Sequence, residues 1–106
     1  MRFFDKEGKP ISAETWKVLK CYIDDYSIIK QEYINEYFIS TVWLGLDHSY
    51  SNSKIPLKIF ETMIFDRDEG KESWFDEYME RCATLEEAYK MHEDAVNFVK
   101  TKGLKI

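Results

Sequence analysis

The fold of this chain is decided by the stretch YFISTVWLGLD, residues 37–47. An extended chain points successive side chains to opposite faces, so this stretch presents two faces that are both largely apolar. Such a pattern is typical of a central strand that is covered on both sides, at least in part. One face carries Phe38, Ser40, Val42, Leu44 and Leu46, and the other carries Tyr37, Ile39, Thr41, Trp43 and Gly45.

Three further extended segments accompany this strand. Residues 26–34 precede it across Asn35-Glu36, a plausible hairpin turn because Asn tolerates positive φ. Residues 57–65 follow it with clear alternation, and residues 74–82 are most simply a fourth strand, although residues 74–79 also fit a helical turn. The short connections favour an antiparallel meander, because a parallel pair needs a crossover of a dozen or more residues.

Helical patterns begin and end the chain. Ser12 can cap a short helix over residues 12–23, and Thr84 with Glu87 forms a capping box before a longer helix that ends at Gly103. We therefore predict one α+β domain over residues 1–106, with a four-stranded antiparallel meander and both helices packed on one face. The expected apolar stripe of the last helix is Leu85, Ala88, Tyr89, His92, Ala95, Val96 and Val99.

The composition of the 106 residues supports a core without cross-links. Seven Phe, seven Tyr and three Trp supply large apolar areas, and Cys21 and Cys82 lie far apart without a CxxC pairing. We expect reduced cysteines that serve packing, and neither a cofactor nor a metal site. The longest mostly apolar run, residues 37–46, is about half of what a membrane-spanning helix needs. The charged residues near Met1 do not fit a secretory signal, so we expect a cytoplasmic protein.

The net charge of −5 is unevenly distributed. Residues 1–60 are neutral, residues 61–94 hold 12 acidic against four basic side chains, and residues 95–106 hold three lysines. A solvated helix face with a charged turn explains this distribution. The alternative is an acidic surface that docks on a basic partner protein. We do not expect direct nucleic-acid binding, which requires clustered basic side chains. The acidic surface would consist of Asp66, Asp68, Glu69 and Glu72.

Several motifs carry a resemblance to a known family. STVWLGLDH at residues 40–48, FETMIF at 60–65 and ATLEEA at 83–88, followed by His92-Glu93, resemble the motifs of a family of short bacteriophage and prophage proteins. The similarity covers most of the chain and includes its opening residues 4–11. Cys82 and Met91 stand where that family has Tyr and Gly. The resemblance implies a phage context and supplies no catalytic residues.

Asp47 and His48 lie where the central strand gives way to a polar, serine-rich segment. Such strand ends often hold catalytic or binding groups on a rigid scaffold. A histidine with a carboxylate partner can act as a general base, and a nearby serine can act as the nucleophile. Adjacent residues of an extended chain point in opposite directions, however, so the pair also fits a loop that caps the strand or forms part of a binding surface. The serines in question are Ser49, Ser51 and Ser53.

Glu61 is a carboxylate on a mostly apolar strand, which must find a hydrogen bond or a counter-charge. If the preceding connection makes an ordinary hairpin, Glu61 lies close to Thr41 or Trp43. It then either binds a metal or transfers a proton, or it is bonded to a Thr, to a Trp N–H or to Arg81. His92 is a further candidate partner, but nothing in the spacing brings the histidines and Glu61 together as metal ligands.

Aromatic residues offer a second kind of site. They form either a platform that stacks a base or nucleotide, or simply the core that a small domain needs. The aromatic residues considered are Trp43, Tyr50, Phe60, Trp74 and Tyr78. The candidate binding residues are Trp43, Asp47, His48, Tyr50 and Glu61.

Three hypotheses about function follow. The first is a small, non-enzymatic phage-type accessory protein that binds a host protein or small ligand, as a counter-defence inhibitor or ligand sponge. The second is a small enzyme or nucleotide-binding domain with a site around His48, Asp47 and Glu61. The third is a homo-oligomeric structural module that pairs through exposed sheet edges.

Overall fold

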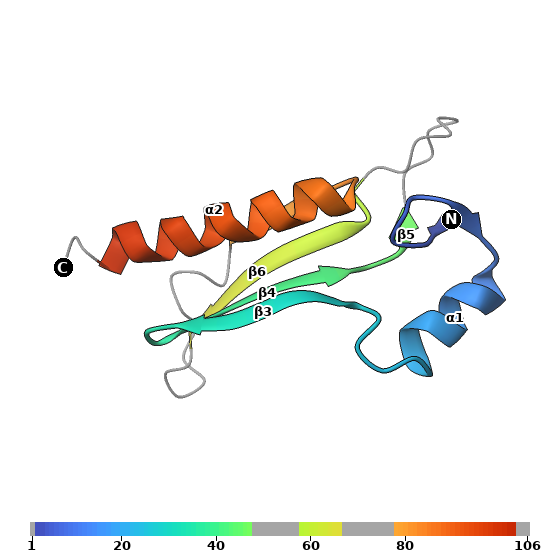
Figure 1. Ribbon diagram of the computed structural model, residues 1–106, viewed down its shortest axis with the longest axis horizontal. Helices are drawn as coiled ribbons and strands as arrows, with labels where there is room; N and C mark the ends of the chain where they lie inside the picture. Colours follow the sequence, from blue (N-terminus) through green and yellow to red (C-terminus); the bar gives the residue numbers. More distant parts are fainter. Residues whose placement is uncertain (1, 48–57, 67–77, 104–106) are drawn as a thin grey trace.

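The computed structural model describes residues 2–47, 58–66 and 78–103. Its main element is a four-stranded antiparallel sheet in the order β3-β4-β6-β7, with α2 lying across one face (Figure 1). The predicted α+β class and the antiparallel meander are therefore confirmed, with residues 37–43 as a central strand. The four strands are β3 (Ile28–Ile34), β4 (Tyr37–Trp43), β6 (Phe60–Asp66) and β7 (Met79–Cys82). Of the predicted fourth strand, residues 74–77 lie outside the described residues.

The register of the strands separates the sheet into two different faces. Side chains directly opposite each other share a face, so each paired row is assigned as a unit. The face toward α2 holds three buried rows, Ile39 with Ile64, Thr41 with Thr62, and Trp43 with Phe60. The opposite face, called the open face below, holds the rows Phe38 with Phe65, Ser40 with Met63, and Val42 with Glu61.

Helix α2 (Leu85–Gly103) contacts all four strands of the sheet. It begins at the predicted capping box, in which the Thr84 hydroxyl accepts from the Glu87 amide and the Glu87 carboxylate accepts from the Thr84 amide. The buried stripe differs from the prediction at one position. Tyr89 is exposed, and Met91 is buried in its place beside Ala88. Ala88, His92, Ala95 and Val99 are buried against the sheet as expected, whereas Leu85 and Val96 are partly buried and pack against the two core clusters.

A second, smaller sheet lies at one end of the main sheet. It has the order β2-β1-β5, from β2 (Pro10–Ile11), β1 (Arg2–Phe4) and β5 (Leu46–Asp47). The stretch predicted as one strand over residues 37–47 is therefore two, because Gly45 turns the chain with a φ of +75°. After that turn, β5 pairs with β1 rather than with a strand of the main sheet.

Helix α1 (Ala13–Cys21) begins after Ser12, whose side chain accepts from the Thr15 amide as predicted. It packs against β1 at the end of the molecule, whereas α2 covers the face of the main sheet (Figure 1). The expectation that both helices share one face is corrected in this respect. The reason is that the Trp16 indole donates to the Leu44 carbonyl, which fixes α1 beside the turn between β4 and β5.

Candidate functional site

The buried face of the sheet contains a chain of hydrogen bonds. The hydroxyls of Thr41 and Thr62 are 2.5 Å apart, and Oγ1 of Thr41 lies 2.7 Å from Nδ1 of His92. On the other side of the imidazole, Nε2 of His92 lies 2.8 Å from Oε1 of Glu32. The chain thus runs Thr62–Thr41–His92–Glu32, through three strands and α2, and is called the polar chain below.

The polar chain lies between two hydrophobic clusters. On one side Ile39 and Ile64 pack with Ala95 and Val99, and on the other Trp43 packs in a larger cluster. The Thr41–Thr62 row falls between the flanking rows of the sheet. Buried polar groups must be hydrogen-bonded to avoid a desolvation cost of roughly 1–3 kcal/mol each. These hydrogen bonds therefore fix how α2 sits on the sheet. The larger cluster includes Phe4, Ile59, Phe60, Ala88 and Met91.

The donors and acceptors of the polar chain follow from the carboxylate at its end. A carboxylate only accepts, so Nε2 of His92 carries the hydrogen that is donated to Glu32. With a neutral imidazole, Nδ1 then accepts from the Thr41 hydroxyl, and Thr41 accepts from Thr62. Every polar side-chain group along the chain thereby has a partner.

Hydroxyl, imidazole and carboxylate follow one another here in the order used by nucleophilic hydrolases. The burial is the reverse of what such chemistry needs. Thr41, Thr62 and His92 are fully buried, whereas the Glu32 side chain is 33% exposed. A substrate would meet the carboxylate and not the hydroxyl. The polar chain is therefore a structural element of the core.

Asp47, one of the candidate catalytic residues, lies on β5 in the smaller sheet. It is buried and forms an ion pair with Arg2, its register partner on β1. The carboxylate is therefore held by a structural partner at the end of the smaller sheet. His48 and Tyr50, with the serines at 49, 51 and 53, lie outside the described residues.

Glu61 lies on the open face and not beside Thr41 or Trp43. Its register partner on β4 is Val42. Thr41 lies opposite Thr62 and Trp43 lies opposite Phe60, and both of these pairs are on the other face of the sheet. Of the proposed partners, Arg81 is the one found, with 2.8 Å between its Nε and Oε2 of Glu61. Asp47 and Glu61 thus belong to different sheets, and each has its own arginine.

Trp43, a predicted binding residue, is fully buried in the core. Its indole N–H donates to the Phe4 carbonyl, and its own carbonyl accepts from Nζ of Lys20 at 2.9 Å. Burial lowers the pKa of Lys20, and electrostatic interactions with Cys21 and Glu61 oppose this shift only in part. Trp43 therefore ties α1 and β1 to the main sheet. Phe60 is also fully buried in the core.

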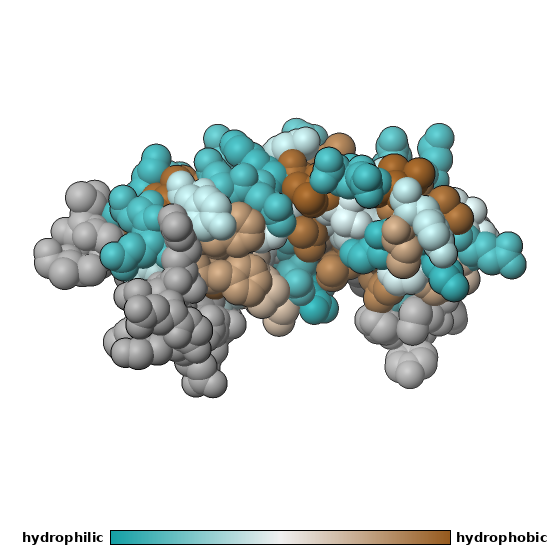
Figure 2. All heavy atoms as spheres, turned by 90° about the horizontal axis from the view of Figure 1, so that it is seen from below, coloured by the Kyte–Doolittle hydropathy of each residue, from teal (hydrophilic) through white to brown (hydrophobic). Residues whose placement is uncertain are grey.

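The open face carries an aromatic row that crosses three strands. Tyr33 of β3 pairs with Phe38 of β4, which pairs with Phe65 of β6. The ring centroids are 4.8 Å apart in the first pair and 6.3 Å in the second. Figure 2 views the molecule from the side opposite α2 and shows hydrophobic side chains gathered across the middle of this face.

A groove of about 420 Å³ opens between β7 and α2. Burial raises the pKa of the Cys82 thiol on its wall to about 11, and the nearby Glu87 carboxylate adds to the shift. Burial also raises the pKa of Tyr78, with help from the charges of Glu80 and Asp94. The groove is therefore acidic in part of its lining. It is lined by Tyr78, Glu80, Arg81, Cys82, Glu87, Lys90, Met91 and Asp94.

The predicted acidic surface falls almost entirely outside the described residues. Asp66 ends β6, and Asp68, Glu69 and Glu72 are not described, nor is Trp74. Within the described ranges, no three His, Cys, Asp or Glu side chains come together in a way that could hold a metal ion. Both cysteines are free thiols, with Cys21 exposed and Cys82 partly buried.

Sequence reasoning missed the polar chain as a unit. It singled out His92 but paired it with Glu61, whereas its partners are Thr41 and Glu32. The sequence did contain one signal for it, because each of two apolar strand faces carries a single threonine. Thr41 lies between Ile39 and Trp43 on one strand face, and Thr62 lies between Phe60 and Ile64 on the other. Glu32, on a strand with many polar residues, gave no comparable signal.

Neither described helix combines the length and apolar character that crossing a membrane requires. No protein-family model, curated protein or solved structure matches this chain.

Proposed function

We propose that this chain is a small, non-enzymatic accessory protein of the phage type that binds a host protein through the open face of its main sheet. The observation that carries the proposal is the exposure of apolar side chains on that face. Phe65 is 40% exposed, Met79 51% and Ile28 39%. Large apolar side chains gathered on one surface are characteristic of binding sites in soluble proteins.

The composition of the open face fits a protein partner. Interface centres are rich in aromatic residues and Met and poor in unpaired charge. Here the aromatic row of Phe38 and Phe65 is followed by Met63 and Met79, which are register partners. The charges at the far end of the face, Glu61 and Arg81, neutralise each other in an ion pair. A nucleic acid would instead require several free basic side chains.

The buried condition of the polar chain supports a binding role over an enzymatic one. Its hydroxyls are enclosed by the core, and Asp47 is paired with Arg2. The remaining candidate catalytic residues are Glu61, which is paired with Arg81, and His48, which lies outside the described residues. A role in blocking a host defence protein follows from the resemblance to phage proteins and is part of the proposal on that ground alone.

The test uses affinity-tagged protein in bacterial lysate, followed by purification of any stoichiometric complex. The variant Phe65→Ser/Met79→Ser removes two exposed apolar side chains from the open face. The matched control Val18→Ser/Tyr22→Ser removes two exposed apolar side chains from the α1 region. We expect the wild type and the control to retain one and the same partner, and the open-face variant to lose it.

Retention of the partner by the open-face variant would contradict the proposal, as would failure of the wild type to retain any partner. A third outcome, self-association that the open-face variant abolishes, would show that the face is occupied by a second copy and would also overturn the proposal. Circular dichroism of each variant confirms that it is folded.

A further inference from the structure

Strand β3 is the longer of the two edges of the main sheet. In the part of the chain that the structure describes, its seven residues pair with β4 on one side and with no strand on the other. The opposite edge, β7, has only four residues. A long edge strand presents unpaired backbone N–H and C=O groups, which makes it a template for pairing with another chain.

The sequence of β3 is self-complementary about its middle residue. Gln31 is flanked by Lys30 on one side and Glu32 on the other, and Ile28 and Ile34 lie at the ends. When two identical strands pair in antiparallel fashion about Gln31, each Lys30 lies directly opposite Glu32 of the second copy. Opposite charges in directly facing positions stabilise an antiparallel pair, and like charges destabilise it.

We propose that two copies of this chain associate through β3, antiparallel and centred on Gln31, to form a continuous eight-stranded sheet. The proposal is independent of the proposed function. We infer that a second copy of the chain pairs with this edge because Lys30 and Glu32 flank Gln31 with opposite charges. Two identical strands centred on Gln31 therefore match each lysine with a glutamate. A register shifted to centre on Glu32 would set two carboxylates against each other, and one centred on Lys30 would set two ammonium groups against each other.

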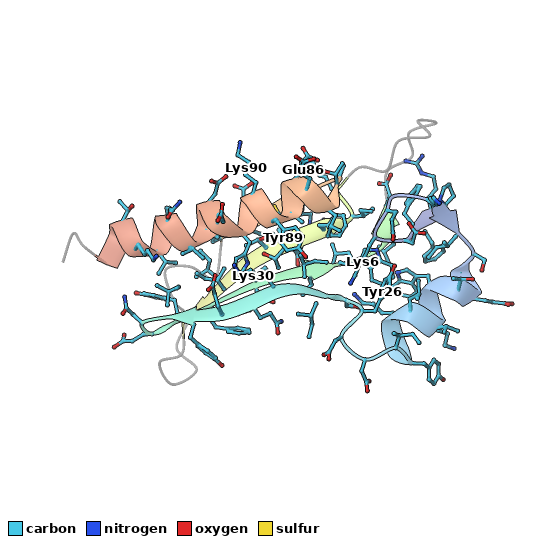
Figure 3. All side chains as sticks on the ribbon, viewed as in Figure 1. Lys6, Tyr26, Lys30, Glu86, Tyr89 and Lys90 are labelled. Atoms are coloured by element: carbon cyan, nitrogen blue, oxygen red, sulfur yellow. The ribbon has the colours of Figure 1, made fainter. Side chains whose placement is uncertain are left out.

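The positions of the two charged side chains suit this arrangement. Lys30 pairs with Thr41 and Glu32 with Ile39, so both project on the face of the sheet that carries α2. Figure 3 shows Lys30 on this side, between β3 and α2. A two-fold axis normal to the sheet keeps that face on the same side in both copies. Glu32 is held in place by the hydrogen bond from His92 and remains partly exposed. A positioned carboxylate loses less side-chain entropy when it pairs.

The β-bulge between Ile28 and Lys30 sets the length of the contact. It shifts the register of β3 against β4 at that point, and a bulge bends the strand that carries it and increases the local twist. The paired ladder is therefore short and centred on residues 30–32, with two ion pairs around Gln31. Such a small interface predicts a weak dimer, with a dissociation constant on the order of micromolar to hundreds of micromolar.

The test is sedimentation equilibrium of the purified protein up to about 1 mM, a concentration chosen to populate a weak dimer. We expect wild-type protein to dimerise. The Lys30→Glu substitution places a carboxylate opposite Glu32 of the second copy, and this repulsion should raise the dissociation constant of the dimer at least about tenfold. The matched control Lys17→Glu, which makes the same charge change on an exposed position of α1, should leave it unchanged.

Mixing two variants gives the sharpest result. Glu32→Lys alone should also weaken self-association, whereas an equimolar mixture of Lys30→Glu and Glu32→Lys proteins should restore dimers, because each introduced charge then faces its opposite. A monomeric wild type, a dimeric Lys30→Glu protein, or a mixture that stays monomeric would overturn the proposal. Because Glu32 also accepts from His92, circular dichroism checks that the variant folds. If it does not, Lys30→Glu against Lys17→Glu decides the outcome.

Discussion

His92 of α2 and Thr41 of β4, 51 residues apart in the chain, are joined by a 2.7 Å hydrogen bond in the middle of the core. The bond connects the helix to the central strand between two hydrophobic clusters. Apolar packing tolerates sliding, whereas a buried imidazole between two polar partners does not. The contact therefore fixes the position of α2 on one face of the sheet, and α2 does not cover the opposite face.

His92→Ala should be among the most destabilising substitutions in the described core. It removes a fully buried ring and leaves the Thr41 hydroxyl short of one partner, so we expect a loss of about 2–4 kcal/mol in the free energy of unfolding. Urea denaturation measures this change in the free energy of unfolding. Glu93→Ala, on the exposed side of the same helix turn, is the control and should change stability by less than about 0.5 kcal/mol. Equal effects from the two variants would contradict a structural role for His92.

Thr41→Val should cost more stability than Thr62→Val. Thr41 bonds both His92 and Thr62, whereas Thr62 bonds Thr41. The first substitution leaves two buried groups without their partner, at a cost of about 1–3 kcal/mol, and the second leaves one. Both variants keep the side-chain shape, so differences in packing are small. Urea denaturation gives the free energy of unfolding of both variants. A larger loss for Thr62→Val than for Thr41→Val would show that the hydrogen bonds of the polar chain differ from those in the structure.

Gly45→Ala should destabilise the junction between the two sheets. Gly45 has a φ of +75°, and a Cβ there would clash with the Trp43 ring and lie 2.7 Å from Nε1 of Trp16. We expect a loss of about 2–4 kcal/mol from backbone strain and overpacking together. Gly8→Ala is the control, because Gly8 also has a positive φ, of 82°. The difference between the two variants then gives the contribution of overpacking at Gly45. Thermal denaturation that shows Gly45→Ala unchanged would rule out this account of the turn.

Cys82 should be slow to alkylate in the folded protein. Burial and Glu87 raise the pKa of its thiol to about 11 from an ordinary value of 9, so its thiolate fraction at pH 8 falls by about 100-fold. The greater nucleophilicity of a more basic thiolate offsets part of this, which leaves a rate roughly tenfold lower. In a Cys21→Ser background, iodoacetamide labelling of folded and urea-unfolded protein compares the two states directly.

The sign of the pH dependence provides a further check on Cys82. In the folded protein the labelling rate should keep rising as the pH approaches 11, whereas in the unfolded chain it should level off near pH 9. A folded protein whose labelling rate levels off near pH 9 would show that the thiol is not shielded.

The main sheet could be predicted from the sequence because its strands alternate and Asn35-Glu36 makes a tight turn between β3 and β4. The boundaries of α2 followed from the capping box at Thr84 and Glu87, and the stripe including His92 identified its buried side. These are local signals, and each is carried by neighbouring residues.

The smaller sheet and the polar chain could not be predicted, because they depend on contacts between distant segments. Nothing near Arg2 indicates that it pairs with Asp47, and nothing near Glu32 indicates a bond to His92. Glu61 shows the same difficulty. Its need for a partner was evident, but the face on which it lies was set by the register of β6 against β4.

The most direct test of the central claim is amide chemical-shift mapping of the isotope-labelled protein with the partner that it retains from lysate. We predict the largest changes at open-face positions, including Gln31, Ser40 and Met63, with α2 little affected. Changes confined to α2 and the groove beside β7, with the open face unmoved, would contradict the account.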